Sequence, residues 1–114
     1  MPFRIIVASE HVSMIRTVTG VLRLLSMSCV ITLTTTLTEQ MIEHLHQQEA
    51  NLLILGFSRP HARSAIQQAR ACRPKLRVIW IGDTDGSLPE ADSTLSQPYT
   101  ALRLIDAVTK TLRK

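Results

Sequence analysis

The stretch NLLILGFSRP, residues 51–60, decides the fold. Its core, residues 52–55, is short, wholly apolar and flanked by polar residues, which is typical of a central strand in a parallel sheet that is covered on both faces. Pro60 suits the first turn of a helix, because the amide that proline lacks would have no partner there. The stretch therefore predicts a buried strand that passes directly into a helix.

The same alternation of patterns continues on both sides of this stretch. Apolar segments alternate with segments of helical spacing, and short helical connections between apolar strands require a parallel sheet with helices on both faces. The sequence thus predicts an α/β fold with five parallel strands in the order 2-1-3-4-5. Strands are expected over residues 3–8, 29–35, 52–55, 76–81 and 93–96, and helices over 12–27 and 60–73 and from Thr36 and Thr100 onward.

Two details of this arrangement are specific to the chain. Fourteen residues separate Gly82 from Gln97, and they must hold a loop, any helix and the last strand. An average helix alone takes about 11–12 residues, so the fourth helix of the alternating pattern is expected to be short or absent. In the last helix, the residues expected to face the sheet are Leu102, Ile105, Val108 or Thr109, and Leu112.

Composition limits the class of protein. The chain has 114 residues, of which 45% are hydrophobic and 19% charged, and this profile predicts one soluble domain over residues 1–114 rather than a disordered chain. No apolar run approaches the ~20 residues that span a bilayer. Cys29 and Cys72 are isolated and no export signal precedes the first strand, which favours a reducing cytoplasm and inert thiols.

Positive charge is concentrated in the second half of the chain. Residues 58–114 carry a net charge of +5 and residues 1–57 a net charge of −1. The basic run holds no acidic residue and predicts one positive surface. A solvated helix face is favoured over nucleic-acid binding, because no aromatic platform for bases accompanies the charges. The run consists of Arg59, Arg63, Arg70, Arg73, Lys75 and Arg77.

Three segments resemble the receiver domains of response regulators. Residues 51–60 are similar to the family's third strand, in which an Asp-Leu-x-x-Leu-Asp run ends in the phosphoacceptor and a proline follows four residues later. ADSTLSQPY, residues 91–99, is similar to the Ala-Asp-x-Tyr-Leu-x-Lys-Pro-Phe segment, and IIVASE, residues 5–10, is similar to the first strand and its acidic pair. The resemblance covers essentially the whole chain and implies the flavodoxin-like receiver fold.

The resemblance also implies that the family's chemistry is lost. Phosphoryl transfer to a carboxylate needs that carboxylate, further carboxylates to hold Mg²⁺, and a hydroxyl and an ammonium to bind the phosphoryl oxygens. Thr94 also replaces the aromatic residue that family members use as a rotamer switch. We therefore expect no phosphorylation, no catalytic residue, no cofactor and no metal. Gly56 occupies the acceptor position, Gln97 the lysine position, Gly82 the Thr/Ser position, and Ala8 and Ser9 the acidic pair, although a shift of one residue places Glu10 in the second position of the pair.

The carboxyl ends of the strands still define a candidate crevice. The two glycines are expected to leave room there, and nearby hydroxyl and amide groups supply hydrogen bonds, so a small-ligand sensor is an open alternative. Metal binding by His11, His61 and Glu10 is disfavoured against two exposed loop histidines. The candidate crevice-lining residues are Ser9, Glu10, Gly56, Ser58, Gly82, Asp83 and Gln97.

These observations favour a non-catalytic, phosphorylation-independent signalling module that binds a protein partner or forms a homodimer. We expect it to be the regulatory N-terminal domain of a larger bacterial regulator. The face formed by the first and last helices, or the edge of the fifth strand, is the candidate interface, and Asp106 is expected to pair with Lys110. Nucleic-acid association through the basic half is the remaining alternative. The candidate interaction residues are Arg63, Arg70, Arg103 and Lys110.

Overall fold

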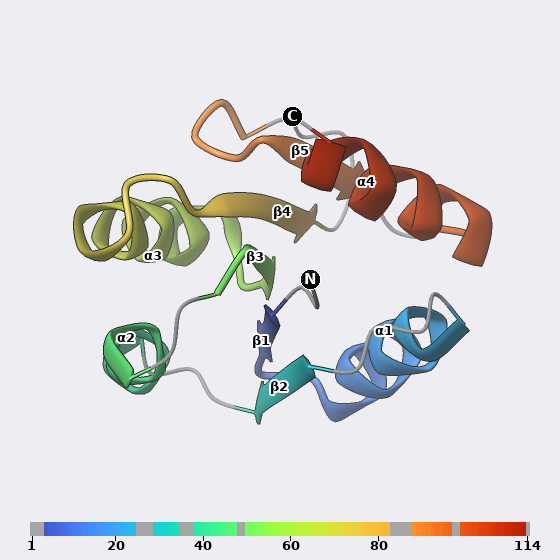
Figure 1. Ribbon diagram of the computed structural model, residues 1–114, viewed down its shortest axis with the longest axis horizontal. Coiled ribbons are helices and arrows are strands. Elements are labelled where there is room, and N and C mark those ends of the chain that lie inside the picture. Colours follow the sequence, from blue (N-terminus) through green and yellow to red (C-terminus); the bar gives the residue numbers. More distant parts are fainter. Residues whose placement is uncertain are drawn as a thin grey trace.

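The structure is a computed structural model that describes residues 4–24, 29–34, 38–47, 50–82, 88–96 and 99–113. Strands and helices alternate along the chain up to β4 (Figure 1). The elements are β1 (Arg4–Ser9), α1 (Val12–Leu24), β2 (Cys29–Thr34), α2 (Thr38–Gln47), β3 (Leu52–Gly56), α3 (Arg59–Cys72), β4 (Arg77–Gly82), β5 (Ser93–Ser96) and α4 (Ala101–Arg113). The predicted helix start at Thr36 lies outside the described residues.

The five strands form one parallel sheet in the order β2-β1-β3-β4-β5. This is the order that the sequence predicts. The register sets Ser9 beside Gly56 at the ends of β1 and β3, and Gly82 beside Ser96 at the ends of β4 and β5. All four residues therefore lie along the carboxyl edge of the sheet.

Helices cover both faces of the sheet. In Figure 1, α1 and α4 lie on one side and α2 and α3 on the other. Successive residues of β1 alternate between the two cores: Ile5 and Val7 pack with α1 and α4, and Ile6 and Ala8 pack with α2 and α3. Since side chains alternate across a strand, only strands covered on both faces can be apolar at every position.

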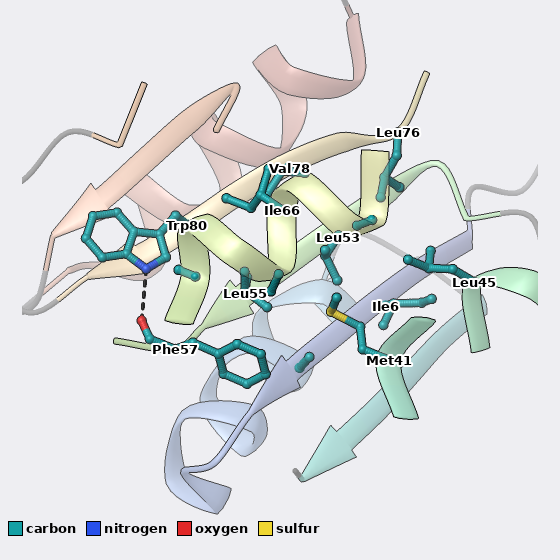
Figure 2. Packing of buried hydrophobic residues seen from close by; sticks show 14 of the residues in the cluster. Ile6, Met41, Leu45, Leu53, Leu55, Phe57, Ile66, Leu76, Val78 and Trp80 are labelled. Atoms are coloured by element: carbon teal, nitrogen blue, oxygen red, sulfur yellow. Dashed lines mark hydrogen bonds between the residues drawn. The ribbon is translucent and has the colours of Figure 1, made fainter. Parts of the chain in front are cut away.

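The inner face of α3 agrees with the prediction. Pro60 lies in the first turn, and the four predicted inward residues are fully buried. Three of them are alanines, so the helix can approach the sheet closely, and the larger Ile66 packs in the same cluster as Leu53 and Leu55 (Figure 2). The buried residues of α3 are Ala62, Ala65, Ile66 and Ala69.

The prediction for the last helix, α4, is confirmed for Val108, which is buried, and for Ile105 and Leu112, which pack against the same core, but it is wrong for Leu102. Leu102 is 78% exposed, whereas Leu104, Val108 and Thr111 are buried. At 3.6 residues per turn, Leu102 lies about 200° around the helix from Leu104. The buried stripe includes a polar residue, because the Thr111 hydroxyl hydrogen-bonds the Ser93 hydroxyl of β5 at 2.9 Å. Thr100 caps the helix as predicted, with its Oγ1 accepting a hydrogen bond from the Arg103 amide at 3.1 Å.

The connection between β4 and β5 has an irregular described part. Leu88–Asp92 forms a turn and a bend with no helix, in agreement with a short or absent fourth helix, while residues 83–87 lie outside the described part. Leu88 is 1% exposed and packs into the core beneath α2 and α3. Arg63 Nε lies 2.9 Å from Glu90 Oε1, and Arg70 Nη2 lies 2.8 Å from Asp92 Oδ2. The segment is thus held against α3 at two points.

Candidate functional site

Gly56 ends β3 on the face that α1 covers. A Cβ atom at this position would lie 2.2 Å from Met14 Sδ and 2.7 Å from Met14 Cε, and 3.0 Å from Ser9 Oγ. Heavy atoms that are not bonded do not approach so closely, so the Met14 side chain occupies the space in which a larger residue at 56 would begin. Met14 is itself only 6% exposed.

The Ser9 hydroxyl joins the ends of β1 and β3. The side chain is fully buried, and its Oγ donates a hydrogen bond to the Gly56 carbonyl at 3.2 Å. The same Oγ accepts a hydrogen bond from the His11 amide at 3.0 Å. A buried hydroxyl needs such partners, and here its donor and one acceptor site are already used within the protein.

Gly82 ends β4 on the opposite face, beneath the indole of Trp80. A Cβ atom at Gly82 would lie 2.6 to 2.9 Å from three atoms of that ring. Trp80 is 3% exposed, and its Nε1 donates a hydrogen bond to the Phe57 carbonyl at 3.0 Å (Figure 2). The ring is rigid and hydrogen-bonded, so it cannot move aside as easily as a methionine side chain.

Two further side chains pack around this indole. The Arg59 guanidinium lies 5.5 Å from the Trp80 ring centroid, within the range of a cation–π interaction. The His61 ring stacks on Phe57 with a centroid distance of 4.2 Å and an interplanar angle of 8°. The end of α3 that follows β3 therefore adds an aromatic and cationic layer to the carboxyl edge.

Side chains lie directly beside both glycines, where the sequence suggests room for a ligand. Met14 fills the space beside Gly56 and Trp80 fills the space beside Gly82, because protein interiors close over missing side chains to near-crystalline density. The sequence does carry a signal for the second contact, since Trp80 and Gly82 are two apart on one strand and share a face. It carries none for Met14, whose position depends on the angle between α1 and the sheet.

The remaining predicted site residues differ in burial. Ala8, at the first position of the acidic pair, is buried in the core beneath α2 and α3, whereas the crevice candidates Glu10 and Ser58 are exposed. Ser58 precedes α3 without a side-chain capping bond, and the Glu10 carboxylate lies 3.6 Å from His11 Nε2. Asp83 and Gln97 lie outside the described residues. Within the part of the chain that is described, no three His, Cys, Asp or Glu residues gather in a way that could hold a metal ion.

Two residues of the basic run, which is predicted to form one positive surface, are paired with acidic side chains. Arg63 and Arg70 are paired with Glu90 and Asp92, which follow β4 and fold back over α3. On α4, Arg103 is exposed, and Lys110 Nζ lies 3.0 Å from Asp106 Oδ2, as predicted. The sequence does not predict Glu90 and Asp92 as partners, because both lie beyond the basic run.

Cys72 has a neighbour that its sequence context does not indicate. Its Sγ lies 3.4 Å from His46 Nδ1, so a thiol and an imidazole link α3 to α2. The expectation that this cysteine is isolated is therefore wrong. Elsewhere, partial burial raises the pKa of the Tyr99 phenol above its usual value, because it disfavours the phenolate.

Among the described residues, none of the helices combines the length and apolar character needed to cross a bilayer.

Comparison with known proteins supports the architecture. No family model matches the sequence, and no curated protein matches it either. Solved structures do: a response regulator from Thermotoga maritima has a TM-score of 0.85 at 14% identity, covering 100% of each chain. The signal receiver domain of an HD domain-containing protein from Pseudomonas fluorescens Pf-5 has a TM-score of 0.84 at 14% identity, covering 99% of this chain and 96% of that one. A response regulator receiver domain protein from Methanospirillum hungatei JF-1 has a TM-score of 0.82 at 15% identity, covering 99% and 95%. The chain therefore has the receiver fold of the response regulators.

Proposed function

We propose that residues 1–114 form a single receiver-like signalling module that takes no phosphoryl group, catalyses no reaction and acts by binding protein. We place it in the bacterial cytoplasm, as the regulatory N-terminal domain of a larger regulator. The observation that carries this proposal is the pairing of β1 with β3, which sets Ser9 beside Gly56 and Ala8 beside Leu55. The acceptor position and the positions of the acidic pair therefore hold no carboxylate.

The surroundings of Gly56 support the same conclusion. An acyl phosphate needs a carboxylate nucleophile and an ion that balances the charge on the phosphoryl oxygens. Ala8 and Ser9, at the positions of the acidic pair, are fully buried and neutral. The nearby carboxylate of Glu10 is exposed and lies beside His11. A single exposed carboxylate is a poor Mg²⁺ site, because this ion gives up its water shell reluctantly.

Incubation with acetyl phosphate and Mg²⁺ is expected to leave the protein unmodified. The measurement is intact-mass spectrometry at neutral pH, with a receiver domain that has its acceptor aspartate as the positive control. A Mg²⁺-dependent phosphorylated species, at Glu10 or elsewhere, would contradict the proposal. Equal masses with and without the phosphodonor support it, provided that the control protein is labelled.

We further propose that the partner docks on the surface formed by the first turns of α1 and α4, and that a second copy of the chain is one such partner. Both helices begin at the carboxyl edge of the sheet, and an apolar side chain of each first turn is exposed there. Leu102 is 78% exposed and Val12 is 48% exposed. Large apolar side chains that are exposed to water at a protein surface are candidates for protein contact. Arg103, which follows Leu102, adds a positive charge to this surface.

Leu102→Asp is expected to abolish self-association while changing the free energy of unfolding by less than about 0.5 kcal/mol, since an exposed residue contributes little to folding. The measurement is size-exclusion chromatography with light scattering over a range of protein concentrations. Leu24→Asp is the matched control: Leu24 is 74% exposed but ends α1 near the amino edge of the sheet. A wild-type chain that stays monomeric at high concentration would remove the homodimer, and equal effects of both substitutions would remove the proposed face.

The alternative functions have lost part of their support. A small-ligand sensor at the carboxyl edge was expected because of the space beside the two glycines, and side chains fill that space. Nucleic-acid binding relied on a basic run without acidic neighbours, and Arg63 and Arg70 are paired. Protein binding through an exposed helical face requires neither feature.

A further inference from the structure

A concave site lies at the amino edge of the sheet, opposite the carboxyl edge described above. It is a pocket of about 590 Å³, within the size range of small-molecule sites. Three segments line it: Ala50 and Asn51 just before β3, residues 73–77 from the end of α3 to the first residue of β4, and Leu112 near the end of α4. These segments are far apart in the sequence and meet because all parallel strands begin at this edge.

The charged side chains that line the pocket are all cationic. They are Arg73, Lys75 and Arg77, and no acidic residue is among the described lining residues. Arg73 Nε donates a hydrogen bond to the Leu45 carbonyl of α2 at 3.0 Å, and Arg77 Nη1 donates one to the Thr111 carbonyl of α4. These partners are neutral carbonyls, so each guanidinium keeps its full charge while its orientation is fixed. A guanidinium has five N–H donors, so further donors remain on each arginine.

The helix ends beside the pocket weaken its positive potential but do not cancel it. The carboxyl end of a helix carries a partial charge of about −0.5, and the ends of α2 and α4 accept the hydrogen bonds of the two arginines. Three full positive charges exceed this amount. Arg73 and Arg77 thus also hydrogen-bond the ends of these helices, whereas Lys75 is exposed and has no partner among the described residues.

The remaining lining groups complement these donors. Asn51 Oδ1 accepts a hydrogen bond from the Arg4 amide at 2.8 Å, so the donor half of this side-chain amide is the half that stays available. Pro74, Leu76 and Leu112 provide apolar surface. A ligand that fits these groups has a polar end that only accepts hydrogen bonds, and an apolar body.

We propose that this pocket binds a small organic anion, with its phosphate, sulfonate or carboxylate group at Arg73, Lys75 and Arg77 and its apolar body against Pro74, Leu76 and Leu112. Oxyanions bind arginine through short charge-assisted hydrogen bonds. The proposal does not depend on the docking face of α1 and α4 or on the loss of phosphorylation, because the pocket lies at the other edge of the sheet.

The experiment uses two fluorescent probes that differ only in charge. 1-Anilinonaphthalene-8-sulfonate carries a sulfonate on an apolar body, and N-phenyl-1-naphthylamine is the same body without it. Both are titrated into the ¹⁵N-labelled chain and followed by fluorescence and by amide chemical shifts. We expect saturable binding of the sulfonate that shifts the amides of Asn51, Lys75 and Leu76, weakens at higher ionic strength, and is at least about tenfold tighter than binding of the neutral probe.

Two charge reversals complete the test. Lys75→Glu is expected to weaken binding of the sulfonate by at least about tenfold, without disturbing the arginines that hold the helix ends. Arg59→Glu changes the net charge by the same amount at an exposed position of α3 at the opposite, carboxyl edge of the sheet and is expected to leave the affinity unchanged. Equal weakening by both variants, equal affinity for both probes, or shifts confined to other amides would each overturn the proposal.

Discussion

Trp80→Ala is expected to lower the free energy of unfolding by about 3–5 kcal/mol. The indole is 3% exposed, belongs to the core beneath α2 and α3, and donates its Nε1 hydrogen bond to the Phe57 carbonyl. It also carries Arg59 on its face. Because small domains are stable by only about 5–15 kcal/mol in total, the variant is expected to be partly unfolded under mild conditions.

The measurement is urea unfolding followed by far-ultraviolet circular dichroism. Trp80 is the only tryptophan of the chain, so its fluorescence cannot report on the variant. Trp80→Phe is the matched control: it keeps an aromatic ring and loses the hydrogen bond, for an expected cost near 1 kcal/mol from that bond and a further cost from the smaller ring. A cost for Trp80→Ala no greater than that for Trp80→Phe would mean that the indole does not fill the end of β4.

Gly56→Asp, which places a carboxylate at the acceptor position, is expected to destabilise the protein by about 2–6 kcal/mol. Overpacking against Met14 contributes about 1–3 kcal/mol, and burying a polar group without partners contributes about 1–3 kcal/mol more. Gly56→Ala separates the two effects, because it adds only the methyl group. Urea unfolding of both variants, followed by the fluorescence of Trp80, measures the difference.

Met14→Ala tests whether Met14 causes this cost. Alone, it is expected to cost about 2–5 kcal/mol, as for other buried methionines. In the Gly56→Ala background its cost is expected to be smaller, with a coupling energy of about 0.5–3 kcal/mol between the two positions. Strictly additive costs would show that Met14 does not occupy the space beside residue 56.

The fold could be predicted from the sequence because its strands are covered on both faces. A run such as residues 52–55, apolar at every position, has few alternatives to a central parallel strand, and the helical connections then fix the strand order. The complete inner stripe of α4 could not be predicted in the same way, because Leu102 lies outside it and Thr111 belongs to it. Thr111 is buried against Ser93, and a count of apolar residues cannot register a threonine as part of the inner stripe.

The candidate site, too, could be predicted only in part from the sequence. Missing carboxylates can be read directly from residues such as Gly56 and Ala8. What occupies their place cannot, because Met14 reaches Gly56 across the interface between a helix and the sheet. The ion pairs of α3 could not be predicted for a related reason. Asp92, the partner of Arg70, lies beyond β4 in the sequence and is brought to α3 only by the fold.

The outermost strand, β5, has a consequence for the behaviour of the protein at high concentration. An unpaired strand at the border of a sheet is a template on which other chains can polymerise, and natural proteins blunt such borders by keeping them short and polar. β5 has four residues, three of which are serine or threonine, and its one leucine is turned into the core. The chain thereby protects this border against fibre growth, even where no helix lies between Leu88 and Asp92.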